Sequence, residues 1–379
     1  MTIYPETDEE VVSLVLKAAN ENKKLRIAGA GHSSSPLVKT DDHLISLEHH
    51  KALLSADPDD RTAVLQAGIT IHEAGIALQE RKLSMHNTGD VDVQMLAGAF
   101  STGTHGTGRS LQNLSTMLYG VSMVNGKGEL IEADEQKDPD LMRAIRVSLG
   151  TMGIFLRLKL KLLPAYRLVR KEYFTDIQSC LDHWEELSDQ NRNCDFYWYP
   201  RNDKAKIRIL NLPSEGMQDV PYGKLDKHQE GWSMEVLPRQ RELKFDEMEY
   251  ALPAEAGLAC FLKVRERMKE RHREKVAWRV LVRTVRQDDN YLSTAYKRDT
   301  VTISLHHNAG LPFEDFFNDI EPIFREHDGR PHWGKKHNLT AKDLQALYPE
   351  WKKFQEYRRQ MDPENVFVTP YLQKLLLDY

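Results

Sequence analysis

Two glycine-rich segments hold the residues with the clearest chemical potential in this chain. The first runs from Gly29 to Pro36 (GAGHSSSP) and follows a short apolar run. Its small residues let backbone N–H groups come close to phosphate oxygens, and its serine hydroxyls are further donors. The second, from Gly98 to Gly108, has four glycines, four Ser or Thr residues and no Lys or Glu. Two such segments, about seventy residues apart, indicate one large, doubly phosphorylated ligand held from two sides.

Two other interpretations fit these segments less well. Gly29-Ala-Gly31 after a strand, with Glu48 downstream, is typical of nicotinamide dinucleotide folds. That fingerprint needs a third glycine and a helix whose N-terminus meets the pyrophosphate, but Ser34 stands at the glycine position and Pro36 opens a polar run. The second segment has the small residues of a flexible linker, but Thr and His are poor linker residues. The sequence therefore favours loops that bind the ligand with their own backbone.

Short strands and helices in residues 1–165 must position these loops. Thr7 and Glu10 form a capping box for a helix that reaches about Asn20, and apolar side chains line one face of it. Asn125-Gly126 is a tight hairpin signal. Further strands are predicted at 25–28, 43–47, 64–67, 118–124 and 154–163, and further helices at 71–79 and 141–149.

From Tyr166 the segments become longer, more charged and more alternating. Strands are predicted at 196–199, 206–210, 278–285 and 300–306, and helices at 177–187 and 255–270. This order predicts an antiparallel sheet with helices on one face, so the fold class is α+β. The last fifty residues, from Arg330, return to short motifs and a helix at 351–360.

The composition of the chain indicates which classes of binding partner are not expected. The chain has 379 residues and a formal net charge of -5, with no long basic run, so neither nucleic acid nor an anionic membrane is an expected partner. No apolar stretch is long enough for a membrane span. Cys180, Cys194 and Cys260 are an odd number without metal-ligand spacing, which predicts no metal site and a cytoplasmic location.

The motifs, taken together, resemble the FAD-binding fold shared by vanillyl-alcohol oxidase and para-cresol methylhydroxylase, and within it the sugar-acid lactone oxidases and alditol oxidases. The resemblance implies a two-subdomain FAD-binding domain at 1–165, an antiparallel-sheet cap domain with helices on one face at 166–329, and a C-terminal segment at 330–379 that returns to the FAD domain. It rests on these residues: 26–33 (RIAGAGHS), Asn87-Thr-Gly-Asp90, Gln94, 97–99, 102–108, 147–154, Glu249-Tyr250, Arg283, Tyr296, Arg298-Asp299, 331–335 and 361–363.

The resemblance implies which residues contact FAD. Relatives attach the flavin covalently through the histidine of the Gly-His-Ser motif, which here is His32, although loop chemistry alone would make His32 a phosphate hydrogen-bonding residue. His105 has the alternative of holding the backbone of its own loop. The full expected set is Ala28, Gly29, Ala30, Gly31, His32, Ser33, Ser34, Gly89, Asp90, Gly98, Ala99, Thr102, Gly103, Thr104, His105, Gly106, Thr107, Gly153, Ile154 and His332.

The active site that the resemblance implies departs from the family at one position. Relatives carry Glu-x-Arg on a cap strand, and residues two apart on a strand share a face. Arg283 keeps the arginine, but Leu281 replaces the glutamate. Lys335 matches a lysine that relatives direct at substrate and flavin, and its alternative is an exposed lysine after a turn. We expect Arg283 and Lys335 to be catalytic.

The neighbouring strand and two other segments complete the expected site. His306 is a candidate base because its unperturbed pKa suits proton removal near neutrality, and hydrogen bonding to substrate is an equal alternative. His307 should point the other way. The expected substrate contacts are Leu281, Ser304, Thr107, Glu249 and Tyr250, although a structural role fits Glu249 equally well.

Three functions are consistent with this set of residues. The first is an FAD-dependent oxidase that passes a hydride from a carbinol C–H of a sugar-like alcohol, alditol or aldonolactone to flavin N5, with O2 as acceptor. The second is a dehydrogenase with another acceptor, and the third is a flavin-binding homologue that has lost catalysis, motivated by Leu281. Retention of Arg283 and Lys335 argues against the third. Leu281 favours a modified sugar or a less polar alcohol as substrate.

Overall fold

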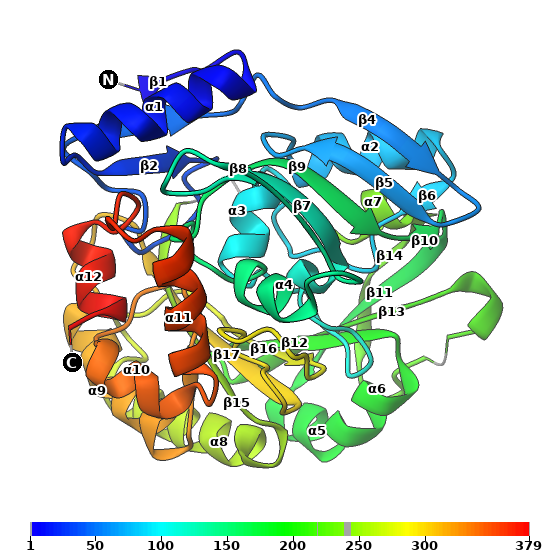
Figure 1. Cartoon of the computed structure of the whole chain (residues 1–379). Coiled ribbons are helices and arrows are strands. Elements are labelled where there is room, and N and C mark those ends of the chain that lie inside the picture. The colour runs from blue at the N-terminus through cyan, green and yellow to red at the C-terminus, as the bar shows by residue number, and fades with distance from the viewer. Residues whose placement is uncertain (1, 218, 239–243, 379) are drawn as a thin grey trace.

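The N-terminal residues form a small parallel sheet covered by one helix. The computed structural model describes residues 2–217, 219–238 and 244–378. Helix α1 (Asp8–Asn20) lies over a sheet of order β1-β3-β2, made of β1 (Thr2–Ile3), β3 (His43–Ser46) and β2 (Leu25–Ala28) (Figure 1). The Thr7 hydroxyl accepts from the Glu10 N–H at 3.2 Å, as the capping box predicts, but the Glu10 carboxylate accepts from the Glu6 N–H rather than from Thr7. The first glycine-rich loop therefore begins where β2 ends.

An antiparallel sheet of order β4-β5-β9-β7-β8 follows. Its strands are β4 (Leu53–Asp57), β5 (Thr62–Gln66), β9 (Ile154–Lys161), β7 (Leu118–Val124) and β8 (Leu130–Asp134), and the elements around it are α2 (Ile71–Glu80), β6 (Leu83–Ser84), η1 (Leu114–Met117), α4 (Pro139–Ile145) and β10 (Leu163–Pro164). The hairpin predicted at Asn125 joins β7 to β8, and the Asn125 side chain accepts from the N–H groups of Lys127 and Glu129. Helix α4 ends before the predicted Leu149, because Leu149 has a φ of 56° and turns the chain.

One predicted loop contains a helix. Residues Leu96–Ser101 form α3, so Gly98 and Ala99 are helical and the second glycine-rich loop begins only at Thr102. The reason is packing: Leu96, Ala99 and Phe100 bury one side of this turn, and their spacing is helical.

The second half of the chain builds a large antiparallel sheet of order β14-β11-β13-β12-β16-β17-β15-β18, as the alternating segments predict. The strands are β11 (Arg167–Asp176), β12 (Asn193–Tyr199), β13 (Lys204–Asn211), β14 (Lys224–Trp232), β15 (Phe245–Pro253), β16 (Val280–Val285), β17 (Thr300–Asn308) and β18 (Arg330–Pro331). The intervening helices are α5 (Ile177–Asp182), α6 (Trp184–Gln190), η2 (Pro213–Glu215), α7 (Ser233–Val236), α8 (Ala254–Arg271) and α9 (Glu314–Glu326). The helix predicted at 177–187 is thus divided at His183.

The two faces of the large sheet differ in chemistry. One face is apolar and covered by helices: Phe196 of β12 packs edge-on against Trp184 of α6 and Phe261 of α8. Because side chains alternate along a strand, Tyr197, Leu281, Ser304 and Glu249, which are aligned across β12, β16, β17 and β15, lie on the opposite face. That face meets the glycine-rich loops.

The C-terminal segment connects the large sheet to the N-terminal part. After β18 it forms α10 (Ala341–Leu347), α11 (Trp351–Met361) and α12 (Pro370–Leu376), and the chain between α11 and α12 reaches β2 (Figure 1). The Leu25 N–H donates to the Val366 carbonyl at 2.9 Å, and the Arg26 guanidinium donates to the Phe367 carbonyl at 2.9 Å. The domain boundaries at residues 165 and 329 stay a prediction. Among the described residues, no helix has both the length and the apolar character needed to span a bilayer.

Candidate active site

A long hollow runs between the two glycine-rich segments, and we call it the cradle. It is lined by loop 28–33, helix α3 and the turn at Leu149 to Gly153. Gly31 has a φ of 66°, which favours glycine, and a Cβ atom added at Gly31 or Gly98 would meet no protein atom within 4 Å. These positions therefore leave room for a ligand. The expected cofactor residues that line the cradle are Ala28, Gly29, Ala30, Gly31, His32, Ser33, Gly98, Ala99, Thr102 and Gly153.

Other expected cofactor residues have structural contacts instead. A Cβ at Gly106 would lie 2.4 Å from the Thr88 carbonyl oxygen, so this glycine permits close backbone packing. The Ser34 N–H donates to the Gly334 carbonyl at 2.8 Å, and the Ser34 hydroxyl accepts from the Glu247 N–H at 3.2 Å. Gly103 and Ile154 likewise lie outside the residues that line the cradle. Ser34 thus ties the first loop to the large sheet and to the C-terminal segment.

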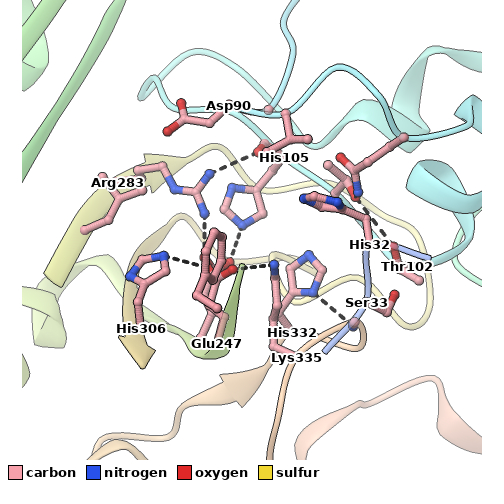
Figure 2. Close-up of a pocket in the computed structure, with 18 residues that line it drawn as sticks. His32, Ser33, Asp90, Thr102, His105, Glu247, Arg283, His306, His332 and Lys335 are labelled. Carbon is pink, nitrogen blue, oxygen red and sulfur yellow. Dashed lines mark hydrogen bonds and ion pairs between the residues drawn. The ribbon is translucent and has the colours of Figure 1, made fainter. Parts of the chain in front are cut away.

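A second hollow adjoins the cradle, and we call it the sheet pocket because the polar face of the large sheet forms its wall. His32, Ser33, Gln94 and Thr102 line both hollows, so the two spaces lie side by side. Figure 2 shows the side chains that converge there. They include the expected residues Gly89, Asp90, Thr104, His105, Glu249, Leu281, Arg283, His306, His332 and Lys335.

Arg283 and Glu249 form a buried ion pair at the centre of this wall. Arg283 also donates to the His105 carbonyl at 3.2 Å, while Glu249 accepts from His105 Nε2 at 2.7 Å and from the Ser304 hydroxyl. Burial alone would raise the pKa of Glu249, but the charges of Arg283 and His105 more than offset this and hold it well below its usual range. Glu249 is therefore the counter-ion that fixes the arginine.

A second charged cluster contains a residue that sequence analysis missed. The Lys335 ammonium donates to Glu247 at 2.5 Å, and His306 Nε2 lies 3.5 Å from the other oxygen of Glu247 (Figure 2). Burial would raise the pKa of Glu247, yet Lys335 and His306 reverse the shift and lower it. Strand periodicity contained the signal: Glu247 is two residues before Glu249, so both must face the same side.

The structure disfavours His306 as the base. Its Nδ1 lies 3.2 Å from the Arg279 carbonyl oxygen while its Nε2 faces Glu247. Both ring nitrogens thus face oxygen atoms of the protein, so neither is directed at the space where a substrate hydroxyl would lie. Hydrogen bonding, the alternative role for His306, fits this geometry. His307 lies on the other face, with its ring 6.2 Å from that of Phe316.

His332 is a neutral imidazole between the two clusters. Its Nδ1 accepts from the Gly334 N–H at 3.1 Å. Burial lowers the pKa of His332 to about 3, with Glu249 opposing the shift and Lys335 adding to it. Atoms of His105, Glu249 and His332 lie within 4.8 Å of one another, a spacing that suits a metal ion. A cation there would compete with Arg283 for Glu249, so we assign this cluster to holding the arginine.

Two expected substrate contacts need correction. Tyr250 faces the helices rather than the sheet pocket: its hydroxyl donates to Glu321 at 2.6 Å and its ring stacks on Phe324. Alternation along β15 explains this, because its neighbour Glu249 takes the other face. The Thr107 hydroxyl donates to the Cys194 carbonyl at 2.5 Å, which turns it toward β12 and away from both hollows.

Asp90 and Ser304 lie at the site in supporting positions. Asp90 accepts from Arg208 at 3.0 Å and from the Tyr197 hydroxyl at 2.8 Å, so it joins its loop to the large sheet. Ser304 is buried behind Glu249. Leu281 is in the same row as Ser304 and presents only an aliphatic surface to the pocket.

Comparison with known proteins agrees with this geometry. Residues 1–134 match the FAD binding domain family and residues 211–375 match the D-arabinono-1,4-lactone oxidase family. An L-gulono-1,4-lactone dehydrogenase of Mycobacterium tuberculosis is 30% identical, with 99% of this chain and 95% of that protein covered. The L-gulonolactone oxidase of Mus musculus is 26% identical, with 99% and 94% covered.

A solved structure shows the same fold. The cholesterol oxidase from B. sterolicum superposes with a TM-score of 0.86 at 17% identity, covering 99% of this chain and 94% of that one. The fold and the cradle thus define an FAD-dependent oxidoreductase of the vanillyl-alcohol oxidase type that acts on CH–OH donors. Within that class, the chain belongs to the family of the aldonolactone oxidases and dehydrogenases.

Proposed function

We propose that this protein oxidises a carbinol carbon of a sugar-derived lactone or a closely related alcohol in the sheet pocket. The observation that carries the proposal is that the two hollows are adjacent, since His32 and Ser33 line both. FAD fits the cradle because its lining is of small residues with open space at Gly31 and Gly98. When bound, FAD supplies the acceptor for the hydride.

The residues of the sheet pocket bind and orient the substrate beside that acceptor. Arg283 is held rigid by Glu249 and by the His105 carbonyl, so its guanidinium offers a fixed positive charge. Lys335 offers a second cation on the opposite wall. Such preorganised cations stabilise negative charge that develops on an alkoxide oxygen. Two cations, each with its own carboxylate partner, also argue for a working site.

The experiment that tests the proposal is a substrate screen. Purified holoenzyme is mixed anaerobically with a panel of aldono-1,4-lactones, alditols and simple alcohols, and bleaching of the flavin absorbance is followed. We expect bleaching with at least one lactone or polyol. Bleaching only with alcohols unrelated to sugars would contradict the substrate class, and bleaching with none would contradict the activity.

We further propose O2 as the electron acceptor, which gives H2O2. A second candidate is a dehydrogenase that uses another acceptor, and it is favoured by the name of the M. tuberculosis relative, L-gulono-1,4-lactone dehydrogenase. Admitting O2 to the bleached enzyme separates the two. Rapid return of colour with stoichiometric peroxide supports the oxidase, whereas slow return without peroxide supports the dehydrogenase.

We also propose that His32 binds the flavin covalently. Support comes from its position at the junction of the two hollows and from its Gly-His-Ser motif. Acid-precipitated protein should keep flavin fluorescence, and His32→Ala protein should release its flavin into the supernatant. Complete release from the wild-type protein would show that the bond is absent, while leaving FAD binding itself intact.

A further inference from the structure

The sheet pocket has three carboxylates in its lining, and their contacts assign them different tasks. Glu249 accepts from Arg283, from His105 and from the Ser304 hydroxyl, so most of its acceptor sites are occupied by protein. Asp90 accepts from Arg208 and Tyr197, which hold it against the large sheet. These two carboxylates therefore support the wall of the pocket.

Glu247 has a different set of contacts. One oxygen is 2.5 Å from the Lys335 ammonium, but the other is 3.5 Å from His306 Nε2, longer than a strong hydrogen bond. An ionised carboxylate offers about four acceptor sites, so Glu247 keeps capacity for a hydroxyl donor. The two flanking cations keep it ionised and hence a good acceptor.

The surroundings hold the Glu247 carboxylate in a defined direction. Glu247 and His306 are paired in the β15–β17 register. The His306 ring is fixed by Phe245, 4.9 Å away in an edge-on arrangement, and by Trp278, stacked at 5.8 Å. The Glu247 N–H donates to Ser34 of the cradle loop. The carboxylate is therefore oriented from the sheet and from the cradle together.

One residue of the same wall is apolar. Leu281 lies on β16 in the row of Ser304 and Glu249 and lines the pocket, where it can neither donate nor accept a hydrogen bond. A substrate hydroxyl buried against it would lose its hydrogen bonds to water without a replacement, which weakens binding about 10-fold or more. A carbon without a hydroxyl suits that position.

From this contrast we infer that Glu247 is the carboxylate that orients the substrate by accepting a hydrogen bond from one of its hydroxyls, and that Leu281 packs against a substrate carbon that carries none. The substrate class is thus a deoxy or alkylated sugar lactone or alcohol rather than a fully hydroxylated one. This inference rests on the proposed oxidation in the sheet pocket, and it adds which part of the substrate each wall recognises.

The test compares Glu247→Gln with Asp246→Asn in the holoenzyme. Asp246 precedes Glu247 on β15. Its ion pair is with Lys336 at 3.2 Å, and neither residue lines the sheet pocket. Steady-state kinetics and calorimetric binding of the oxidised product are measured on lactone pairs that differ by one hydroxyl. We expect Glu247→Gln to weaken kcat/KM and product binding about 10- to 100-fold, as for a lost charge-assisted hydrogen bond, and Asp246→Asn to change both less than twofold.

A second comparison moves the carboxylate from position 247 to position 281. Wild type should prefer the deoxy member of a pair about 10-fold or more, and Leu281→Glu, alone or with Glu247→Gln, should reverse that preference. A purely structural Glu247 would not be compensated by a carboxylate at 281. Leu281→Glu also keeps the test decisive if Glu247→Gln unfolds or loses FAD.

The outcomes separate the inference from the proposed function. If the wild-type enzyme turns over and Glu247→Gln has the same kcat/KM, the inference is wrong and the proposed function stands. The same holds if the wild-type enzyme prefers the hydroxylated member of each pair. A wild-type enzyme that neither binds nor oxidises any member of the panel overturns both.

Discussion

The cradle and the sheet pocket are adjacent but are built in opposite ways. The cradle is lined mainly by small residues from a few short stretches of sequence, with open space at Gly31 and Gly98. The sheet pocket uses charged side chains from β15, β16, β17 and the C-terminal segment, each charge held by a partner. Filling space should therefore damage the cradle, whereas removing charge should damage the pocket and leave cofactor content intact.

The largest effect expected from this comparison is loss of cofactor in Gly31→Val. A side chain at a φ of 66° costs about 1–2 kcal/mol, more when β-branched, and the valine would also occupy open space beside the cradle. The ratio of flavin to protein absorbance should fall about 10-fold or more, since each 1.4 kcal/mol is a factor of ten. Gly216→Val is the control, because Gly216 has a φ of 71° with open space around it but is far from the cradle lining. Equal flavin loss in both variants would contradict the role of Gly31.

In contrast to Gly31→Val, Arg283→Ala should keep its flavin and lose activity. Removing a charge-assisted contact lowers kcat/KM about 10- to 100-fold. Glu249 would then be a buried carboxylate without its cation, which typically costs about 3–5 kcal/mol of stability. Arg286→Ala is the control, because Arg286 is exposed, and it should change neither kcat/KM nor stability. Unchanged turnover in Arg283→Ala would mean that the reaction takes place elsewhere.

The pH dependence of stability should reveal the lowered pKa of the buried His332. Its pKa is lowered from 6.5 to about 3 in the folded protein, chiefly by burial. The unfolded state therefore binds the proton first, so the contribution of His332 is present above pH 6.5 and is lost as the pH falls from 6.5 toward 3. Urea unfolding at a series of pH values should show a smaller loss over this interval in His332→Asn, whose amide oxygen can accept from Gly334. Parallel curves for the two proteins would contradict the shift.

The smallest effect is expected from Tyr250→Phe. The change removes one hydrogen bond to Glu321 on the helix-covered face and leaves the ring stacked on Phe324. Stability should fall by about 1 kcal/mol, while kcat/KM should stay within twofold. A large loss of kcat/KM at unchanged stability would return Tyr250 to the substrate-binding residues.

Sequence reasoning succeeded where structure is determined by neighbours along the chain. The N-cap at Thr7, the hairpin at Asn125 and the cradle loop at Gly31 depend on local backbone chemistry, and each lies where the sequence predicts. Helix α3 was missed because small residues are ambiguous between loop and helix until Leu96 and Phe100 are buried.

The sheet pocket was predicted less completely because its contacts are made between strands. Family motifs supplied Arg283 and Lys335, but the pairing of Lys335 with Glu247 depends on the arrangement of β15 and the C-terminal segment, 88 residues apart. Tyr250 was misplaced although its neighbour Glu249 was found, since a motif names adjacent residues and a strand sends them to opposite faces.

Ser34 links the cradle to the sheet pocket. Its N–H binds the carbonyl of Gly334, and its hydroxyl accepts from the Glu247 backbone, so one residue of the cradle loop fixes both the strand that carries Glu247 and the turn that carries Lys335. A ligand in the cradle that changed the position of Ser34 would therefore also move the strand of Glu247 and the turn of Lys335. Any effect of FAD on substrate affinity through this contact would be matched by an equal effect of substrate on non-covalent FAD binding.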